Sequence, residues 1–214
     1  MTLGWTAPEQ APTVTLLLRH GDTVLSPEHR FAGLRDVPLS AQGTRQAKAA
    51  AVRLATGGGI DAVVSSPLQR AAATAEIAAA ELGLSVTTTD DDLRETDFGE
   101  WEGLTLAEVQ ESWPSAAESW QHDPEQAPPG GESFAATAHR VDQARDRLLR
   151  DHPGQTVLVV SHITPIKILL CRALDVPLSA LYRMYLGSAC LNEVQWHGDK
   201  FAAVRRVNDT NHLP

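Results

Sequence analysis

Four side chains suited to binding a phosphoryl group follow the ends of three predicted strands. Arg19 and His20 follow the first strand, Arg70 lies in the first turn of the helix after the second, and His162 follows the third. Because ligands of α/β proteins bind at the carboxyl ends of parallel strands, these side chains are expected to converge. Two arginines can hold phosphate oxygens bidentately, and the helix predicted to begin at Pro67 adds N–H donors. The pattern predicts a pocket for a phosphate dianion.

Histidines between such cations suit nucleophilic catalysis. One imidazole can attack phosphorus and split a difficult displacement into two steps through a phosphohistidine. Neighbouring cations would lower the pKa of the imidazole and keep its attacking nitrogen unprotonated. Fixed donors would meet the charge that develops on phosphorus, so no metal is required. We expect Glu95 to give the leaving oxygen its proton, and Arg30, in the loop after His20, to close over the substrate.

The elements that must position these groups alternate along the chain. Apolar runs rich in β-branched residues predict strands, and capped amphipathic runs predict helices. The expected strands are 13–18, 60–65, 156–161, 189–196 and 201–207, the last two joined as a hairpin by residues 197–200. The expected helices are 41–55, 67–82, 133–150 and 165–173.

This alternation predicts an α/β fold, a three-layer α/β/α sandwich with helices on both faces of a largely parallel sheet. Residues 1–12 are expected to be a flexible leader or linker, and residues 13–214 one domain. The acidic, tryptophan-bearing stretch at about 96–131 breaks the pattern and is expected to form a small cap-like insertion.

The net charge and the composition of the chain argue against some classes of partner and location. The 214 residues carry a net charge of −9 (18 basic minus 27 acidic), which argues against nucleic acid or an anionic membrane as a partner. The stretch from Thr156 to Cys171 is interrupted by polar residues and proline, so it predicts no membrane span. Residues 1–10 contain no Lys or Arg and no apolar core of export-signal length, so we expect the cytoplasm. Cys171 and Cys190 are expected to be buried and unpaired.

The segment Arg19-His20-Gly21-Asp22-Thr23 resembles the signature of the histidine phosphatase superfamily, also called the phosphoglycerate mutase-like family, in which Arg-His-Gly-Glu/Gln-Thr is usual. Further blocks match in family order, and together they cover roughly residues 14–172. They are 36–40 with Gly43 and Gln46-Ala47, 65–71 with Thr74-Ala75, 95–103, 130–133 and 160–162.

The resemblance implies a phosphoglycerate mutase-like fold and a metal-independent phosphatase without a cofactor. It implies His20 as the phosphorylated nucleophile and Glu95 as the proton donor. The phosphate pocket would consist of Arg19, Arg70 and His162, and Ser26 falls where many members place an asparagine that touches phosphate. There are two departures from the family pattern. Asp22 replaces Glu or Gln, and Ile163 stands where many members have glycine, so the turn there cannot require a glycine conformation.

Residues 161–167, 95–99 and 181–183 are most similar to the C-terminal domain of actinobacterial two-domain proteins. In those proteins a ribonuclease H domain precedes an acid phosphatase or α-ribazole phosphatase-like domain. The resemblance thus implies a fused N-terminal ribonuclease H domain in the full-length protein, with residues 4–12 as the linker. No nuclease activity and no nucleic-acid partner are expected of the present domain.

Several alternatives stay open. The short stretch 103–130 favours hydrolysis of a small phosphorylated metabolite over mutase-type phosphoryl transfer. A catalytically silent phosphate-binding protein and a metal-dependent hydrolase are the competing classes. Candidate substrates are α-ribazole 5′-phosphate, a sugar phosphate and a phosphoglycerate derivative, with a broad acid phosphatase activity as a further alternative. The tryptophans of the insertion favour an aromatic or bulky leaving group. The strands within 189–207 leave open an edge for a homodimer, or an edge that is covered.

Overall fold

Successive residues of the central strands point to opposite faces of one sheet, and both faces are buried. The computed structural model describes residues 11–198 and 201–213, so the first ten residues of the expected leader and two residues of the expected hairpin lie outside the described part. The six-stranded sheet has the order β3-β2-β4-β1-β5-β6. Its strands are β1 (Thr13–Arg19), β2 (Ala62–Ser65), β3 (Thr88–Thr89), β4 (Thr156–Ser161), β5 (Leu191–His197) and β6 (Phe201–Asp209).

The sheet is mixed rather than largely parallel. β3, β2, β4 and β1 run parallel, whereas β5 pairs antiparallel with both β1 and β6. The antiparallel β5–β6 pairing confirms that the last two strands are consecutive neighbours. The site therefore depends on the parallel part, where β1, β2 and β4 end side by side.

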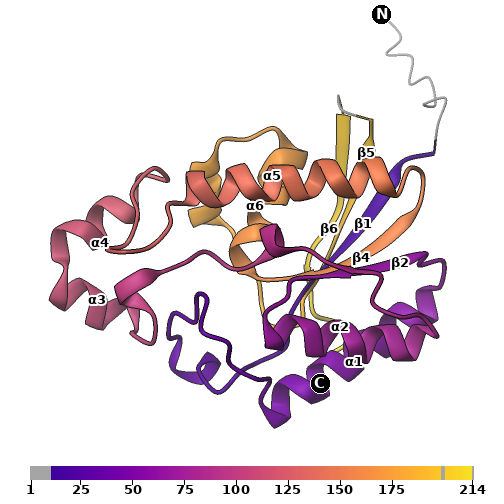
Figure 1. The fold of residues 1–214 in the computed structure, drawn as a ribbon, viewed down its shortest axis with the longest axis horizontal. Coiled ribbons are helices and arrows are strands. Elements are labelled where there is room, and N and C mark those ends of the chain that lie inside the picture. Colours follow the sequence, from indigo (N-terminus) through magenta and orange to yellow (C-terminus); the bar gives the residue numbers. More distant parts are fainter. Residues whose placement is uncertain (1–10, 199–200, 214) are drawn as a thin grey trace, which may run out of the picture.

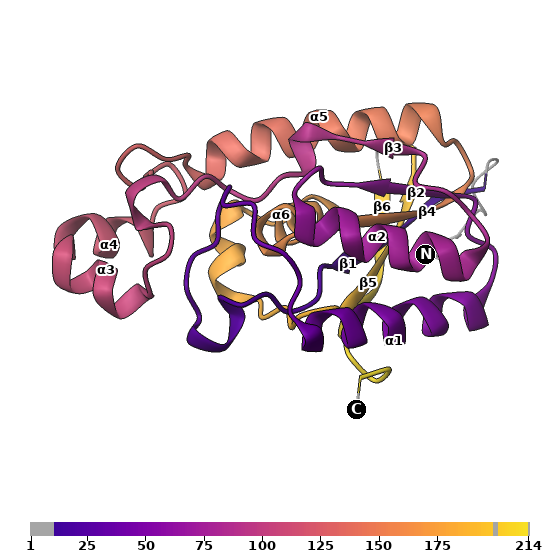
Figure 2. The same cartoon turned by 60° about the horizontal axis from the view of Figure 1, so that its bottom comes forward.

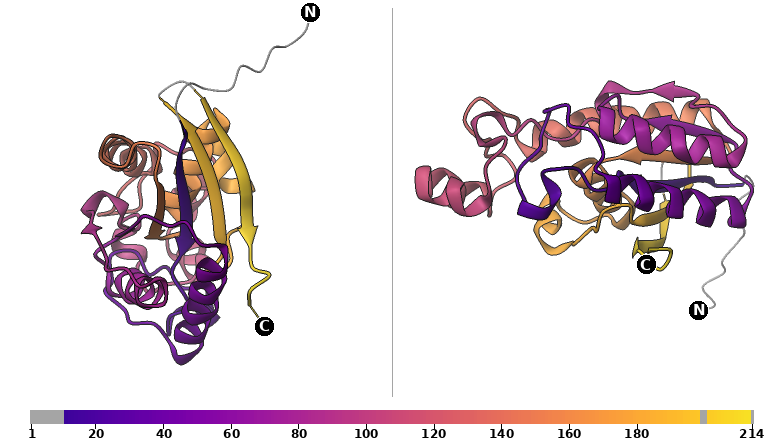
Figure 3. Two further views of the ribbon diagram at one scale, coloured as in Figure 1. Left: turned by 90° about the vertical axis from the view of Figure 1, so that its right-hand side faces the viewer. Right: turned by 90° about the horizontal axis from the view of Figure 1, so that it is seen from below.

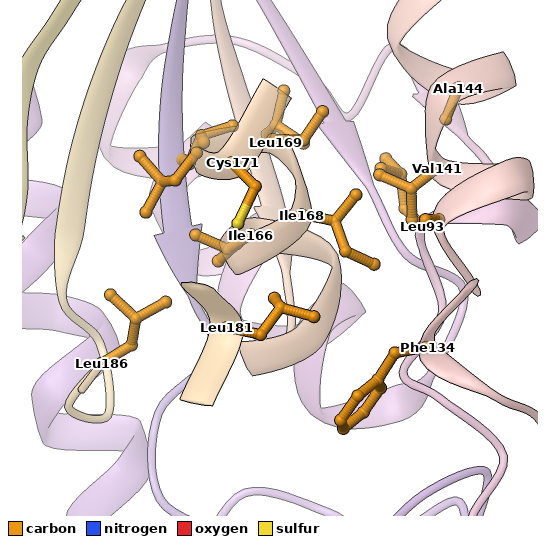
Figure 4. Packing of buried hydrophobic residues seen from close by; sticks show 14 of the residues in the cluster. Leu93, Phe134, Val141, Ala144, Ile166, Ile168, Leu169, Cys171, Leu181 and Leu186 are labelled. Carbon is orange, nitrogen blue, oxygen red and sulfur yellow. The ribbon is translucent and has the colours of Figure 1, made fainter. Parts of the chain in front are cut away.

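Helices cover both faces, as a three-layer sandwich requires (Figures 1 and 3). On one face, α1 (Ala41–Gly57) and α2 (Gln69–Leu82) bury alanines and Leu54 against Leu18, Val63 and Leu158. On the other face, α5 (Phe134–Asp151) and α6 (Ile163–Leu174) pack on Leu17, Val64 and Val159. Figure 4 shows Ile166, Ile168 and Leu169 of α6 between the sheet and Val141 of α5. Because each face is covered, β1 and β4 contain uninterrupted apolar runs, residues 16–18 and 157–160.

The helix ends follow local capping chemistry, with two corrections to the expected boundaries. Ser40 and Ser133 accept backbone N–H bonds at the starts of α1 and α5, as expected. However, α2 begins at Gln69 instead of Pro67, because Leu68 is still extended. Conversely, α6 begins at Ile163 instead of Pro165, with His162 as its N-cap, since proline is tolerated in a first helical turn.

The expected insertion at about 96–131 contains two short helices, α3 (Leu106–Ser112) and α4 (Pro114–Trp120). They extend beyond one end of the sheet and lie beside the loop that follows β1 (Figure 2). Trp101 and Trp120 are buried in this region, where they meet edge to face with ring centroids 5.5 Å apart. Three-residue 3-10 turns occur at Ser26–Glu28, Asp91–Leu93 and Gly99–Trp101, and a longer one at Leu178–Arg183. Among the described residues, no helix combines the length and hydropathy that a membrane crossing requires.

Both cysteines are buried and unpaired, as expected. Cys171 lies in α6, but Cys190 directly precedes β5 rather than lying within a strand.

Candidate active site

His20 lies directly after β1 with its backbone held on both sides. Its N–H donates to the carbonyl of Ser161 at the end of β4 (3.1 Å), and its carbonyl accepts from Ala189 N–H (3.1 Å). The ring Nδ1 lies 2.7 Å from the Gly21 carbonyl, which can only accept, so Nδ1 carries the proton. This tautomer, assigned from the contacts, leaves the lone pair of Nε2 available for attack.

The loop after His20 packs directly on the first turn of α1. A Cβ added at Gly21 would lie 2.3 Å from the Gly43 carbonyl oxygen, so this backbone approach needs glycine. Asp22 exchanges two hydrogen bonds with the amide of Gln46, and Gly21 N–H donates to the Thr74 hydroxyl of α2. The family-pattern residues in α1 and α2 thus hold the backbone beside His20.

Arg70 is fully buried against the ring of His20. Its Nε–H donates to His20 Nε2 at 3.2 Å, and its terminal nitrogens donate to the carbonyls of Gly33 and Arg35 at 2.8 and 2.9 Å. The loop after β1 therefore fixes the plane of the guanidinium. A phosphoryl oxygen placed next to Nε2 would compete for the same Nε–H donor.

Two further donors beside His20 are buried without a partner. Arg19 donates through one terminal nitrogen to the Leu186 carbonyl (2.7 Å), but its Nε has no partner within residues 11–198 and 201–213. The same holds for Nδ1 of His162, whose Nε2 lies 2.7 Å from the Ser66 hydroxyl. We assign the Ser66 hydroxyl, which accepts from Leu68 N–H, as the donor to Nε2; in this tautomer the His162 proton lies on Nδ1. Unpaired buried donors are costly, which favours an anion as their partner.

Both histidines are held neutral. Burial lowers the pKa of His20 well below its usual value, and the charges of Arg19 and Arg70 lower it further. The pKa of His162 is also lowered well below its usual value, by burial first and then by the charge of Arg70 and the proximity of His20. The two rings lie 5.0 Å apart between centroids. A neutral His20 with an unprotonated Nε2 is the form that a nucleophile requires.

Glu95 lies across the same site, 7% exposed. Its Oε1 accepts from the N–H groups of Thr96 (2.9 Å) and Thr164 (3.3 Å), the latter in the first turn of α6. Arg140 of α5 holds the backbone of this segment, since it donates to the carbonyls of Asp92, Arg94 and Glu95 while it pairs with Glu132. The Glu132–Arg140 pair therefore positions Glu95.

These groups border a cavity of about 320 Å³. Its lining includes Arg19, His20, Arg70, Glu95, Ser26 and Arg30, which were expected from the sequence. His162 is fully buried behind this lining, in contact with Ser66. The structure thus brings all the expected site residues to one end of the sheet.

Ser26 and Arg30 have their side chains engaged elsewhere. Ser26 Oγ accepts from Thr23 N–H at 2.9 Å. The guanidinium of Arg30 contacts Glu28, Glu108 and the Gly103 carbonyl, so it ties the loop after β1 to α3. Contact of either residue with phosphate stays a prediction, and for Arg30 it would require breaking these ion pairs.

Several residues that line the cavity were not identified from the sequence. They are Lys167 on α6 and the aromatic residues Phe31, Phe98, Phe134 and Tyr182, which join Trp120, one of the insertion tryptophans expected to favour an aromatic or bulky leaving group. The spacing of Ile163, Thr164 and Lys167 on one face of α6 is the signal that could have indicated Lys167. The aromatic residues come from four separate segments, and only their packing shows that they belong together.

Within the described ranges, no group of three or more His, Cys, Asp or Glu side chains has the geometry of a metal site. The positive charge at this site comes instead from the side chains themselves, chiefly Arg19 and Arg70.

Comparisons with known proteins identify the family model, the relatives and the solved structures that this chain is similar to. Residues 15–210 match the family model described as histidine phosphatase superfamily (branch 1). The chain is 51% identical over 210 residues to a Mycobacterium tuberculosis protein named as bifunctional; the match covers 98% of this chain and 57% of the relative. It is 34% identical to phosphoserine phosphatase 1 of Hydrogenobacter thermophilus, with 92% of this chain and 93% of that protein covered. The crystal structure of a putative α-ribazole-5′-phosphate phosphatase from Escherichia coli superimposes with a TM-score of 0.83 at 29% identity, covering 93% of this chain and 97% of that one.

Proposed function

The chain belongs to the histidine phosphatase superfamily, and from that premise we propose that it hydrolyses small phosphomonoesters through a phosphohistidine on His20. The observation that carries this proposal is the pair of unpartnered buried nitrogens, Arg19 Nε and His162 Nδ1, beside a neutral His20. A phosphoryl group at His20 Nε2 would accept from both. Relatives named as phosphatases support the same reaction.

In the first step, His20 Nε2 attacks phosphorus and the P–O bond to the leaving group breaks. The electron pair of that bond goes to the leaving oxygen, which takes a proton from the carboxyl of Glu95. Arg19, Arg70 and His162 donate to the equatorial oxygens, where charge develops. Because His20 Nδ1 stays bonded to the Gly21 carbonyl, the ring keeps its orientation as it becomes positively charged.

In the second step, water attacks the phosphohistidine. The Glu95 carboxylate takes a proton from that water, a P–O bond forms, and the P–N bond breaks with its electron pair returning to Nε2. The released products are the alcohol and inorganic phosphate. The arginines supply the positive charge that another hydrolase would obtain from a metal ion, so we propose that turnover is metal-independent.

The test is phosphate release from a panel of phosphomonoesters, with chelator present, by the chain and by His20→Asn. Asparagine can still donate to the Gly21 carbonyl but offers no nucleophile. Chelator-resistant turnover that His20→Asn abolishes would support the proposal. Turnover retained by His20→Asn would overturn it. Transfer of phosphate between the positions of a phosphoglycerate, without net release, would favour the mutase reaction instead.

The wider context is also proposed. The chain spans 57% of the length of its mycobacterial relative, which is named as bifunctional. That name supports, for a full-length protein, the fused N-terminal ribonuclease H domain that the resemblance implies. A cytoplasmic location, an absence of nucleic-acid binding by this domain and a homodimer stay predictions.

A further inference from the structure

The cavity joins the phosphoryl-binding groups to an aromatic wall. This wall consists of Phe31, Phe98, Trp120, Phe134 and Tyr182, all of which line the cavity. The rings contact one another continuously, with centroids 4.7 Å apart for Phe31 and Phe98, 5.1 Å for Trp120 and Phe134, and 6.4 Å for Trp120 and Tyr182. A leaving group extending from the phosphorus would therefore lie against rings.

Lys167 also lines this cavity and, unlike Arg30 and Arg70, has unused donors. Arg30 is paired with two glutamates, and Arg70 is held by two carbonyls and His20. Lys167 makes one hydrogen bond, from Nζ to the Leu181 carbonyl (3.0 Å), and no ion pair with any described residue. An ammonium group has three donors, so two remain.

Lys167 lines the same cavity as His20, Glu95 and Arg19. Burial lowers the pKa of Lys167, the negative charge of Glu95 opposes this effect, and the charge of Arg19 adds to it. A half-buried cation without a counter-ion is unfavourable, and an anion brought by a ligand would relieve that cost. Arg19, Arg70 and His162 suffice for the reacting phosphate, so Lys167 is available for another charge.

We propose, on the basis of the phosphatase function above, that Lys167 binds a second anionic group carried by the leaving group of the substrate. The preferred substrates are then phosphomonoesters whose leaving group carries an anionic group and a carbon skeleton that packs on the aromatic wall. The anionic group is a carboxylate or a second phosphate, since either accepts from an ammonium. Lys167 is thus a specificity-determining residue, and neutral leaving groups are poorer ligands.

The test compares substrates that differ only in the second charge. Phenyl phosphate is the neutral member, 3-carboxyphenyl phosphate carries a carboxylate, and 1,3-phenylene bisphosphate carries a second phosphate. Dissociation constants are measured by calorimetry in the His20→Asn background, so that the outcome does not depend on turnover. The variants are Lys167→Met, which removes the charge and keeps the apolar stem, and Lys167→Arg, which keeps the charge. Lys48→Met removes an exposed lysine of α1 and is the matched control.

We expect a charged member to bind more tightly than phenyl phosphate, and Lys167→Met to reduce that preference about 10- to 100-fold, the range of a charged hydrogen bond. Binding of phenyl phosphate should change less than about threefold, and Lys167→Arg and Lys48→Met should keep the preference. The charged ligand whose binding is weakened most by Lys167→Met identifies the anionic group.

Equal weakening of all three ligands by Lys167→Met would overturn the inference, because Lys167 would then act through the structure of the cavity or through Glu95. No preference for a charged member would overturn it as well. The proposed phosphatase function is judged separately, by the turnover of phenyl phosphate by the chain with His20 intact.

Discussion

The Nε–H of Arg70 donates to Nε2 of His20, the nitrogen proposed to attack phosphorus. The same guanidinium is fixed by the Gly33 and Arg35 carbonyls, so its position relative to the ring does not depend on a ligand. In the proposed reaction, the phosphoryl oxygen replaces Nε2 as the acceptor of this donor. The nucleophile is thereby freed as its target arrives.

Arg70→Lys should reduce kcat/KM by about 10²–10³-fold, the cost of removing one fixed donor to a developing anion. Lysine keeps the charge but has neither the Nε–H nor the planar fork that binds both carbonyls. Steady-state kinetics on phenyl phosphate measures the effect, and far-ultraviolet circular dichroism checks that the fold is retained. A loss of less than about threefold would contradict the assigned role of the fork.

Glu95→Gln should slow the reaction of esters with poor leaving groups far more than that of esters with good leaving groups. An alkoxide needs a proton as it departs, and general acid catalysis contributes about 10²–10⁴-fold, whereas 4-nitrophenolate leaves without one. Rates of phosphoenzyme formation for an alkyl phosphate and for 4-nitrophenyl phosphate measure this difference. Equal losses for the two esters would show that Glu95 has another role.

The neutral buried histidines predict a pH dependence of stability. Since the folded-state pKa values of His20 and His162 are lowered, the unfolded chain binds more protons below its own histidine pKa of about 6.5. The contribution of these two histidines to the free energy of unfolding should therefore be fully present above about pH 6.5. It should decrease on acidification toward the folded-state pKa values. The slope is at most about 1.4 kcal/mol per pH unit for each histidine.

Urea unfolding of His162→Gln between about pH 7.5 and about pH 5 checks this dependence, which should be shallower than in the parent chain. Glutamine can still bond to the Ser66 hydroxyl but does not titrate. His139→Gln, at an exposed position of α5, is the control and should keep the parent slope. A slope that His162→Gln leaves unchanged would show that other groups control acid stability.

Trp101→Ala should lower the free energy of unfolding by about 3–5 kcal/mol, because it leaves a large void beneath the insertion. Trp101 is fully buried and contacts the rings of Phe31 and Trp120. Trp101→Phe should cost less, since it keeps an aromatic ring and removes an indole N–H that no described atom accepts. Leu106→Ala, at a partly exposed site of α3, should stay within about 0.5 kcal/mol. Urea denaturation measures all three variants.

Much of the fold and the phosphoryl-binding end of the site could be predicted because the signals are local. Strand β4 was expected at its observed bounds, and capping serines located the starts of α1 and α5. The expected starts of α2 and α6 were wrong, because Leu68 stays extended before α2 and because α6 contains Pro165 within its first turn instead of beginning there.

The rest of the site depends on contacts between distant segments. Arg30 pairs with Glu108, 78 residues away, and no periodicity reveals such a partner. The same applies to Tyr182, whose hydroxyl donates to the Trp120 carbonyl and so joins the turn after α6 to the insertion. Which side of α6 carries Lys167 into the cavity is likewise set by how α6 packs on α5 and the sheet (Figure 4).

The contact between Gly21 and Gly43 has a consequence for changing this protein by design. Because the two backbones are in contact, the position of His20 depends on helix α1. The aromatic wall and Lys167 come from other segments of the chain. Mutant libraries aimed at new substrates can therefore vary cavity-lining residues outside α1, such as Lys167, while Gly21 and Gly43 are left unaltered. A side chain at Gly43 would meet the Asp22 backbone, and we expect it to displace the loop that carries His20 and so to lower the turnover of every ester.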